Sequence, residues 1–234
     1  MNLDLNTHQL RVLGCLVEKQ MTTPEYYPLT LSALTNACNQ KSNREPVMNL
    51  SESDTLDAIK GLEAKYLARE KQLPGSRVAK YEHKLTGTLT DQFGFSNEEV
   101  AVLSILFLRG PQTPGEIRTR TQRACHFEDI HAVDRVLKNL ANKNGKQFVM
   151  PLERQPGKRE IRYIHLFATE EASLQRHANG ALSSDADEHL KTDVVSNAEA
   201  SAETQNELIL LKNEVLQLRI ELDELKAQMA QFTN

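Results

Sequence analysis

Tryptophan is absent from this 234-residue sequence, and Phe, Tyr and Trp together supply only 5% of it. So few aromatic side chains fit small helical domains better than a binding barrel lined with aromatic rings. The longest largely apolar run, residues 100–108, is far shorter than the roughly 20 residues that cross a bilayer. We therefore predict no membrane span. Residues 1–10 carry no basic region before an apolar core, so we also predict no signal peptide and expect a cytoplasmic protein.

Signals for catalysis or metal binding are also missing. Cys15, Cys38 and Cys125 are odd in number and far apart in the sequence, so neither a disulfide framework nor a Cys-x-x-Cys metal pair is predicted, and we expect buried free thiols. Cys125 with His126 and His131 is a local cluster that lacks metal-ligand spacing. Neither of the common glycine-rich phosphate loops occurs. The sequence therefore predicts no enzyme, no metal and no other cofactor.

Charge is distributed unevenly along the chain. Residues 169–234 contain five Lys and Arg against 13 Asp and Glu, whereas residues 1–168 contain 23 against 19. The basic surplus of the body lies in residues 96–168. Many nucleic-acid-binding domains are more strongly basic, so this composition permits DNA binding but does not require it.

Residues 206–230 have the pattern of a coiled-coil helix. Apolar side chains recur at alternating steps of three and four residues, at Leu208, Leu211, Val215, Leu218, Leu222, Leu225 and Met229. The flanking g positions are acidic and the e positions basic, which favours a parallel, in-register homodimer over an antiparallel pair. The alternative is a helix that packs on its own domain. Residues 169–205, which precede it, predict a flexible acidic linker.

Two segments of the body repeat one pattern. Asn6 and Gln9 predict a capping box at the start of a helix, and Ser96 and Glu99 repeat it ninety residues later. In each segment two further helical patterns follow, at residues 29–38 and after the cap Ser51 in the first segment, and at residues 114–121 and 127–142 in the second. Two strand-like runs come next, joined by a Pro-Gly turn with its tip at Gly75 or Gly157.

Three helices followed by a hairpin are typical of a winged helix. We therefore predict a mainly α fold with small β-hairpins (α+β), in which tandem winged-helix domains precede the coiled-coil helix. The predicted domains are residues 1–85 and 96–168, joined by a linker at 86–95, and their number leads us to expect two cores. Two unrelated α+β domains are the alternative.

One stretch carries a family resemblance. Residues 29–52, LTLSALTNACNQKSNREPVMNLSE, closely resemble the signature stretch of the YceH-like family, a bacterial family of unassigned function. The resemblance extends through GCLVEK at residues 14–19 and TPGEIRTRT at residues 113–121, and it includes the tail. It implies a fold of tandem winged helices and carries over no activity.

Residues 39–50 form an unusually long connection between the second and third predicted helices. A simple helix-turn-helix uses three or four residues at this place, whereas this connection has about twelve. It contains Lys41 and Arg44, followed by Glu45 and Pro46, which favour extended backbone. Two interpretations stay open: a loop that presents Lys41 and Arg44 to a phosphate or a partner, and an elaborate capping connection that stabilises the domain.

DNA binding and protein binding are both compatible with the charge pattern. The N-terminal ends of the predicted third helices are acidic, which disfavours ordinary insertion into the major groove. Basic residues lie instead on and just after the second predicted helix of the second segment, and on the predicted hairpins of both segments. The candidate residues for binding DNA or a partner are Lys41, Arg44, Arg77, Lys80, Arg118, Arg120, Arg123, Arg154, Lys158, Arg159 and Arg162. The sequence thus predicts a homodimer that binds double-stranded DNA, or a winged-helix adaptor that binds another protein.

Overall fold

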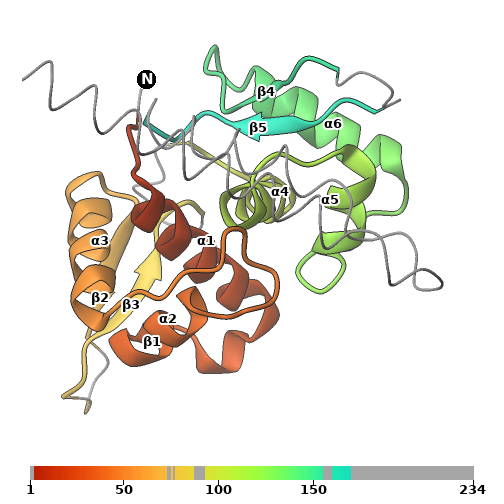
Figure 1. The fold of residues 1–234 in the computed structure, drawn as a ribbon. Helices are drawn as coiled ribbons and strands as arrows, with labels where there is room; N and C mark the ends of the chain where they lie inside the picture. The colour runs from red at the N-terminus through yellow and green to blue at the C-terminus, as the bar shows by residue number, and fades with distance from the viewer. Residues whose placement is uncertain (1–2, 73–74, 76, 87–92, 155–159, 170–234) are drawn as a thin grey trace, which may run out of the picture. The chain divides into compact units, whose positions relative to one another are not determined.

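The computed structural model describes residues 3–72, 75, 77–86, 93–154 and 160–169. These residues form six α-helices, one short 3-10 helix and two small antiparallel sheets (Figure 1). They belong to one compact unit, Met1–Asp185, whereas a second unit, Ala186–Asn234, lies outside the described residues. The coiled coil at residues 206–230 therefore stays a prediction. Within the described part of the chain, no helix is both long enough and apolar enough to span a membrane.

The first segment contains three α-helices and a three-stranded sheet in the order β1-β3-β2. Its elements are α1 (Thr7–Thr22), η1 (Pro24–Tyr26), β1 (Leu29–Thr30), α2 (Leu31–Cys38), α3 (Glu52–Ala64), β2 (Ala68–Lys71) and β3 (Lys80–His83). The second helix begins two residues later than predicted because Leu29 and Thr30 pair with Tyr81 and Lys80 of β3. Gly75 lies in the turn of the β2–β3 hairpin with φ +80, a conformation that glycine adopts without strain.

The second segment repeats the order of three helices and a hairpin. Its elements are α4 (Asn97–Arg109), α5 (Pro114–Thr121), α6 (Ile130–Ala141), β4 (Val149–Pro151) and β5 (Tyr163–His165). The helix α6 begins three residues later than the predicted start, because the Asp129 side chain accepts a hydrogen bond from the Ala132 N–H at 2.7 Å and so acts as the N-cap. The predicted turn tip at Gly157 lies outside the described residues.

Local sequence signals set the starts of α1 and α4. In α1, the Gln9 N–H donates to the Asn6 side chain at 2.9 Å and the Asn6 N–H donates to the Gln9 side chain at 3.0 Å. Ser96 and Glu99 form the same reciprocal pair at α4. Both predicted capping boxes are confirmed. Each satisfies two N–H groups that a helix start would otherwise leave without a partner.

The described residues share one hydrophobic core, where two cores were expected. Buried apolar side chains of both segments form one connected cluster, since the helix α1 packs against α4. The two helices approach closely at Gly14, where an added Cβ would lie 2.9 Å from Leu108 Cγ. The ends of the body also meet, because the Leu5 N–H donates to the Phe167 carbonyl at 2.8 Å. The two segments therefore form one body, and the predicted domain boundaries stay a prediction.

Candidate functional site

The 39–50 connection is fixed to the helix α1 by a buried arginine. Arg44 is 5% exposed and donates to the two carboxylate oxygens of Glu18 at 3.1 and 2.5 Å. Its Nε also donates to the Ala37 carbonyl at 3.1 Å, at the end of α2. Burial acts to lower the pKa of Arg44, but its hydrogen bonds and charge attraction to Glu18 help to outweigh that effect and raise the pKa. Arg44 is therefore not presented at the surface, and of the two interpretations of the connection the stabilising one holds for this side chain.

A second buried arginine, Arg11, joins the last residue of α2 to the 39–50 connection. It donates to the Cys38 carbonyl at 2.9 Å and to the Pro46 carbonyl at 2.5 Å. The neighbouring thiols of Cys15 and Cys38 are buried and free, as predicted, whereas Cys125 is only half-buried.

The connection also reaches the second segment. The Glu45 N–H donates to the Leu108 carbonyl at 2.8 Å, and the Arg109 side chain donates to Asn43 Oδ1. These two bonds join the connection to the C-terminal end of α4. Its length is thereby explained, because a turn of three or four residues between α2 and α3 would not extend to the other segment.

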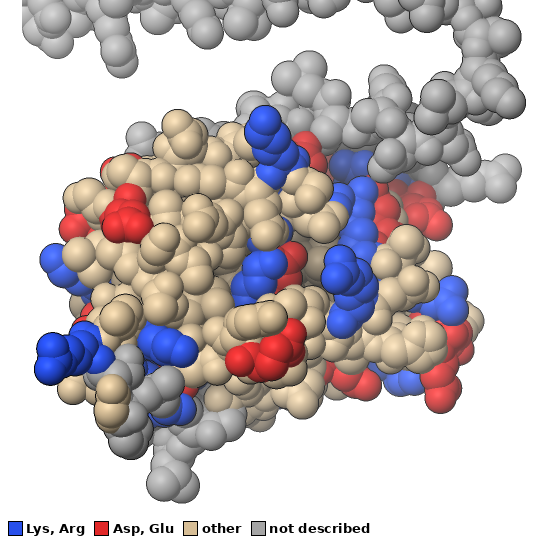
Figure 2. All heavy atoms as spheres, turned by 90° about the horizontal axis from the view of Figure 1, so that it is seen from below, with Lys and Arg blue, Asp and Glu red and all other residues tan. Residues whose placement is uncertain are grey.

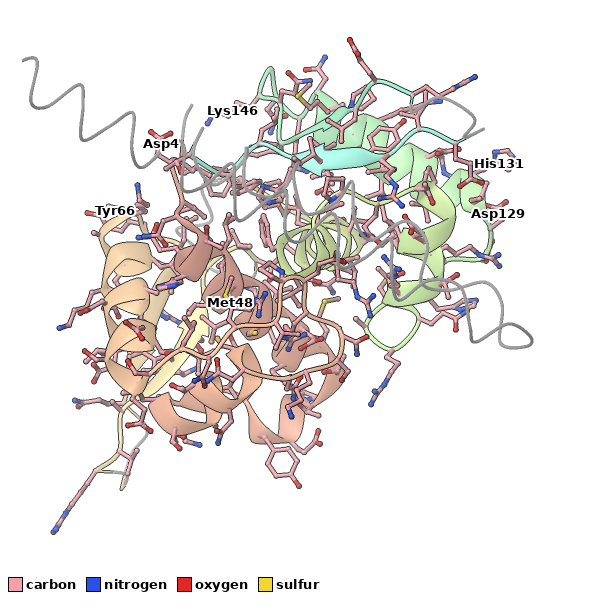
Figure 3. The ribbon with its side chains drawn as sticks, in the orientation of Figure 1. Asp4, Met48, Tyr66, Asp129, His131 and Lys146 are labelled. Atoms are coloured by element: carbon pink, nitrogen blue, oxygen red, sulfur yellow. The ribbon has the colours of Figure 1, made fainter. Side chains whose placement is uncertain are left out.

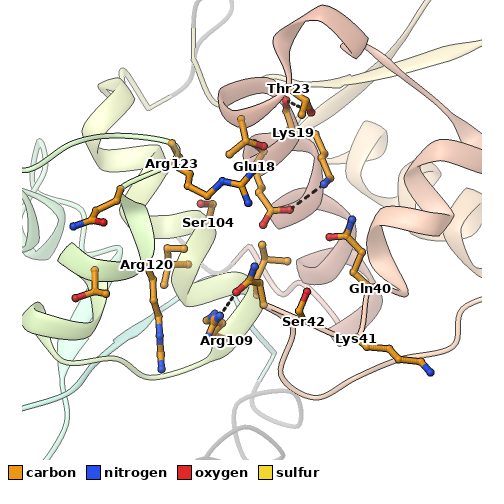
Figure 4. A pocket seen from close by; sticks show the side chains of 17 residues that line it. Glu18, Lys19, Thr23, Gln40, Lys41, Ser42, Ser104, Arg109, Arg120 and Arg123 are labelled. Carbon is orange, nitrogen blue, oxygen red and sulfur yellow. Dashed lines mark hydrogen bonds and ion pairs between the residues drawn. The ribbon is translucent and has the colours of Figure 1, made fainter. Parts of the chain in front are cut away.

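A basic cleft of about 760 Å³ lies between this connection, the C-terminal ends of α1 and α4, and α5. Five cationic side chains line it: Lys19, Lys41, Arg109, Arg120 and Arg123. Lys and Arg side chains gather around a hollow on the corresponding face (Figure 2). In the close-up, Lys19 and Lys41 come from the first segment and Arg109, Arg120 and Arg123 from the second (Figure 4). We call this site the basic cleft.

The electrostatic balance of the basic cleft is positive. Its one carboxylate among the described lining residues, Glu18, is engaged by Arg44, and Lys19 lies 3.9 Å from it. Arg120 lies 3.7 Å from Glu116, a distance at which an ion pair is weak in solvent. The structure gives Lys41 and Arg123 no ion-pair partner within its described ranges, and both are exposed. Such an arrangement can bind anionic oxygens.

Most of the other candidate residues lie away from the basic cleft. Arg118 donates to the Phe127 carbonyl at 3.3 Å and the Glu128 carbonyl at 2.8 Å, so it stabilises the turn between α5 and α6. Arg162 lies 3.7 Å from Glu116. Arg77 and Lys80 lie on the β2–β3 hairpin. Arg154 lines a separate pocket with Asp134 and Glu160. The other candidates, Lys158, Arg159 and the heptad residues, are outside the described residues.

The start of α3 is exposed and acidic, as the sequence predicts, whereas the first turn of α6 holds no acidic residue and only the exposed Glu128 and Asp129 precede it. Glu52 and Asp57 of α3 are exposed, and hydrogen bonds from Ser51 lower the pKa of Asp54. Asp129 and His131 lie at the outer end of α6 (Figure 3). Carboxylates at these places stabilise the helix starts but would repel phosphates.

Sequence reasoning missed two cations of the basic cleft, Lys19 and Arg109. They occupy equivalent positions of the repeat, because the offset of ninety residues that relates Asn6 to Ser96 also relates Lys19 to Arg109. Both stand in the last turn of the first helix of their segment. The repeat itself was therefore the signal that could have found them. No group of three or more His, Cys, Asp or Glu side chains in the described part of the chain could hold a metal ion.

Comparisons with known proteins give relatives of unknown function. Residues 5–158 match the family model described as "Protein of unknown function, DUF480". The chain is similar to a UPF0502 protein of Aliivibrio salmonicida, with 45% identity over 97% of this chain and 95% of that protein. A UPF0502 protein of Vibrio parahaemolyticus is 44% identical over 98% of each chain. One of Vibrio cholerae is 49% identical over 73% of this chain and 79% of that protein.

Proposed function

The chain belongs to the DUF480 family of proteins of unknown function, and from the charge of its own residues we propose that it is a cytoplasmic DNA-binding protein. The resemblance to the YceH-like family is confirmed by the same relatives. The observation that carries the proposal is the basic cleft, where five cations from both segments surround one carboxylate that Arg44 engages. Cations in such number bind the phosphodiester backbone by releasing its counterions.

We also propose that each segment is a winged-helix domain. The support is the element order, in which three helices precede a β-hairpin in both segments. In winged-helix proteins that read the major groove, the third helix is the recognition helix, but we assign no DNA contact to α3 or α6. Because Glu52 and Asp57 of α3 are exposed, we place the DNA contacts at the rim of the basic cleft instead. Binding through phosphates positions a duplex without reading its bases, so it is independent of sequence.

Homodimerisation through residues 206–230 would double this surface. Linking two copies raises the effective concentration of the second site once the first has bound DNA. The dimer therefore binds a long duplex more tightly than one copy does. In this role the protein is a binding protein without catalytic activity.

A protein-interaction adaptor is the second candidate function. The observation that favours it is the exposed acidic start of α3, together with Val47, which is 57% exposed on the 39–50 connection. Exposed carboxylates and an exposed apolar side chain are features that a basic protein partner could use. The adaptor would need no binding of nucleic acid.

A titration of random-sequence duplex DNA against the full-length protein distinguishes the two functions. DNA binding should be detectable near 50 mM salt, and four neutralised phosphates would weaken it by roughly a hundredfold at 200 mM. An affinity that does not change with salt, or no binding at 50 mM, would reject DNA as the ligand and leave the adaptor. The notional wing pair, Lys158 and Arg159, lies outside the described residues and can be tested in the same way. Removal of both should lower the logarithmic salt slope by about two if the wing also neutralises phosphates, and should leave it unchanged if the basic cleft alone does so.

A further inference from the structure

The cations of the basic cleft lie at two depths. Lys41 and Arg123 are exposed at the rim, whereas the Lys19 side chain is only 20% exposed and Arg109 is half-buried. A duplex presents its phosphates on a broad convex surface, which can contact the rim. The two deeper cations are better placed for a compact anion that enters the cleft.

The size and lining of the cleft indicate the class of that anion. A volume of about 760 Å³ falls within the range typical of small-molecule sites. None of the described lining residues is aromatic, so the cleft offers no ring on which a base could stack. Among the uncharged lining residues, the hydroxyl groups of Thr22, Thr23 and Thr119 already donate to backbone carbonyls. The hydroxyl and amide donors that the lining can offer come from Gln40, Ser42, Asn43 and Gln122. These donors and the five cations suit phosphate oxygens.

The ends of α1 and α4 do not oppose an anion in the cleft. The last carbonyls of a helix normally repel negative charge. Here the Lys19 carbonyl, one of the last four of α1, accepts from the Thr23 N–H at 3.0 Å and from Thr23 Oγ1 at 3.2 Å. The Leu108 carbonyl accepts from Glu45, as described above. These hydrogen bonds engage two of the terminal carbonyls, and Lys19 and Arg109 add positive charge in the last turns of the two helices, which favours an anion there.

We propose that the deep part of the basic cleft binds a compact polyphosphate group, free or carried by a nucleoside, between Lys19 and Arg109. The bound group replaces Asn43 as the acceptor for Arg109 and blocks the cleft to DNA. The binding of polyphosphate stands on the geometry of the cleft alone, whereas the competition with DNA rests on the proposed function. A phosphorylated small molecule would thus regulate the DNA-binding surface.

Calorimetric titration of the full-length protein with sodium tripolyphosphate and with adenosine triphosphate, at constant ionic strength and without divalent ions, tests the site. We expect both probes to bind with affinities that agree within about threefold, because the cleft recognises phosphates and not a base. Much tighter binding of the nucleotide would overturn recognition by phosphates alone. Sulfate at the same ionic strength should not reproduce the signal. If it does, the effect is ionic and the site is rejected.

Variants of the deep cations identify the binding residues. The double variant Lys19→Gln with Arg109→Gln should weaken tripolyphosphate binding by at least about tenfold, since two charge-assisted hydrogen-bond donors are lost. Arg135→Gln with Lys138→Gln, which removes two exposed cations of α6, is the control with the same charge change and should alter binding less than about twofold. Arg109→Lys keeps the charge and should retain most of the affinity. Equal effects of the two double variants would overturn the proposal even if one of them is less stable.

Competition is measured last, by adding tripolyphosphate to the protein bound to duplex DNA. The proposal predicts displacement well beyond that caused by sodium chloride of the same ionic strength. If DNA binds but tripolyphosphate displaces no more than the chloride control, regulation by polyphosphate is wrong. If DNA does not bind at 50 mM salt, the proposed function fails, while the calorimetric titration still decides the polyphosphate site.

Discussion

Arg44 and Glu18 form a two-point ion pair, in which the terminal nitrogens of Arg44 lie 3.1 and 2.5 Å from the two carboxylate oxygens of Glu18. The Arg44 side chain is fully buried, and Glu18 is 17% exposed. This pair fixes the 39–50 connection to α1 and neutralises the carboxylate that lines the basic cleft. The fold and the charge of the cleft therefore depend on one contact between residues 26 positions apart.

Replacement of Arg44 by Met should destabilise the protein strongly. The substitution removes one partner of a buried ion pair and leaves the Ala37 carbonyl without its donor, so we expect a loss of about 3 kcal/mol or more in the free energy of unfolding. Urea denaturation followed by circular dichroism measures it. Lys41→Met in the same connection is the control and should change stability by less than about 0.5 kcal/mol. Equal stabilities of the two variants would contradict the assigned role of Arg44.

The close approach of α1 to α4 can be tested at Gly14. An added Cβ would lie 2.9 Å from both Cγ and Cδ2 of Leu108 and 3.1 Å from Phe107 Cβ. Although alanine favours a helix by about 1 kcal/mol over glycine, crowding in a packed core costs about 1–3 kcal/mol. We expect Gly14→Ala to be destabilising in the wild-type background and stabilising in the background of Leu108→Ala. Strictly additive effects of the two substitutions would show that the helices are not in contact here.

Buried His83 should make stability depend on pH. Burial lowers its pKa to about 4, and the ring is neutral because Nδ1 accepts from the Leu85 N–H at 3.2 Å while Nε2 contacts Gln20 Oε1. The unfolded chain binds a proton at this histidine more readily than the folded protein does. The contribution of neutral His83 to the free energy of unfolding is therefore complete above pH 6.5 and is lost as the pH falls from 6.5 towards 4, by up to about 3 kcal/mol. Urea denaturation at several pH values should give a flatter dependence for His83→Gln. Parallel curves would contradict this assignment.

The coiled coil outside the described residues is tested by its oligomeric state. Leu218→Lys would bury a charge at a d position of the heptads and should convert the predicted dimer into a monomer. Analytical sedimentation at tens of micromolar measures the change. The same result is expected when residues 207–234 are deleted. A wild-type protein that is already monomeric would remove the coiled coil from the account.

The parts of the fold that follow from local signals could be predicted from the sequence. The capping boxes of α1 and α4 each involve side chains three residues apart, and the two hairpins follow from strand-like runs around Pro-Gly turns. The start of α2 was misplaced because Leu29 and Thr30 pair with a strand about fifty residues away. No local pattern contains that contact. The single core was missed for the same reason, since it depends on packing of α1 against α4.

The candidate site could be predicted only in part. Lys41, Arg120 and Arg123 were identified from charge and lie in the basic cleft. Charge alone does not tell an exposed arginine from a buried one, and Arg44 is buried because Glu18 lies beside it in space. Sequence reasoning also missed a further match between the two segments, in which Tyr81-Glu82-His83 corresponds to Tyr163-Ile164-His165. Both histidines are buried in the last strand of their segment.

The slope of DNA affinity against salt concentration tests the central claim most directly. It should be measured on random duplex for the wild type, for Arg120→Gln with Arg123→Gln at the basic cleft, and for Arg135→Gln with Lys138→Gln on α6. Both double variants remove two positive charges, one at the cleft and the other on α6. Our account predicts that the cleft variant lowers the logarithmic slope by about two and that the α6 variant leaves it unchanged. A slope that falls for the α6 variant and not for the cleft variant would contradict the account.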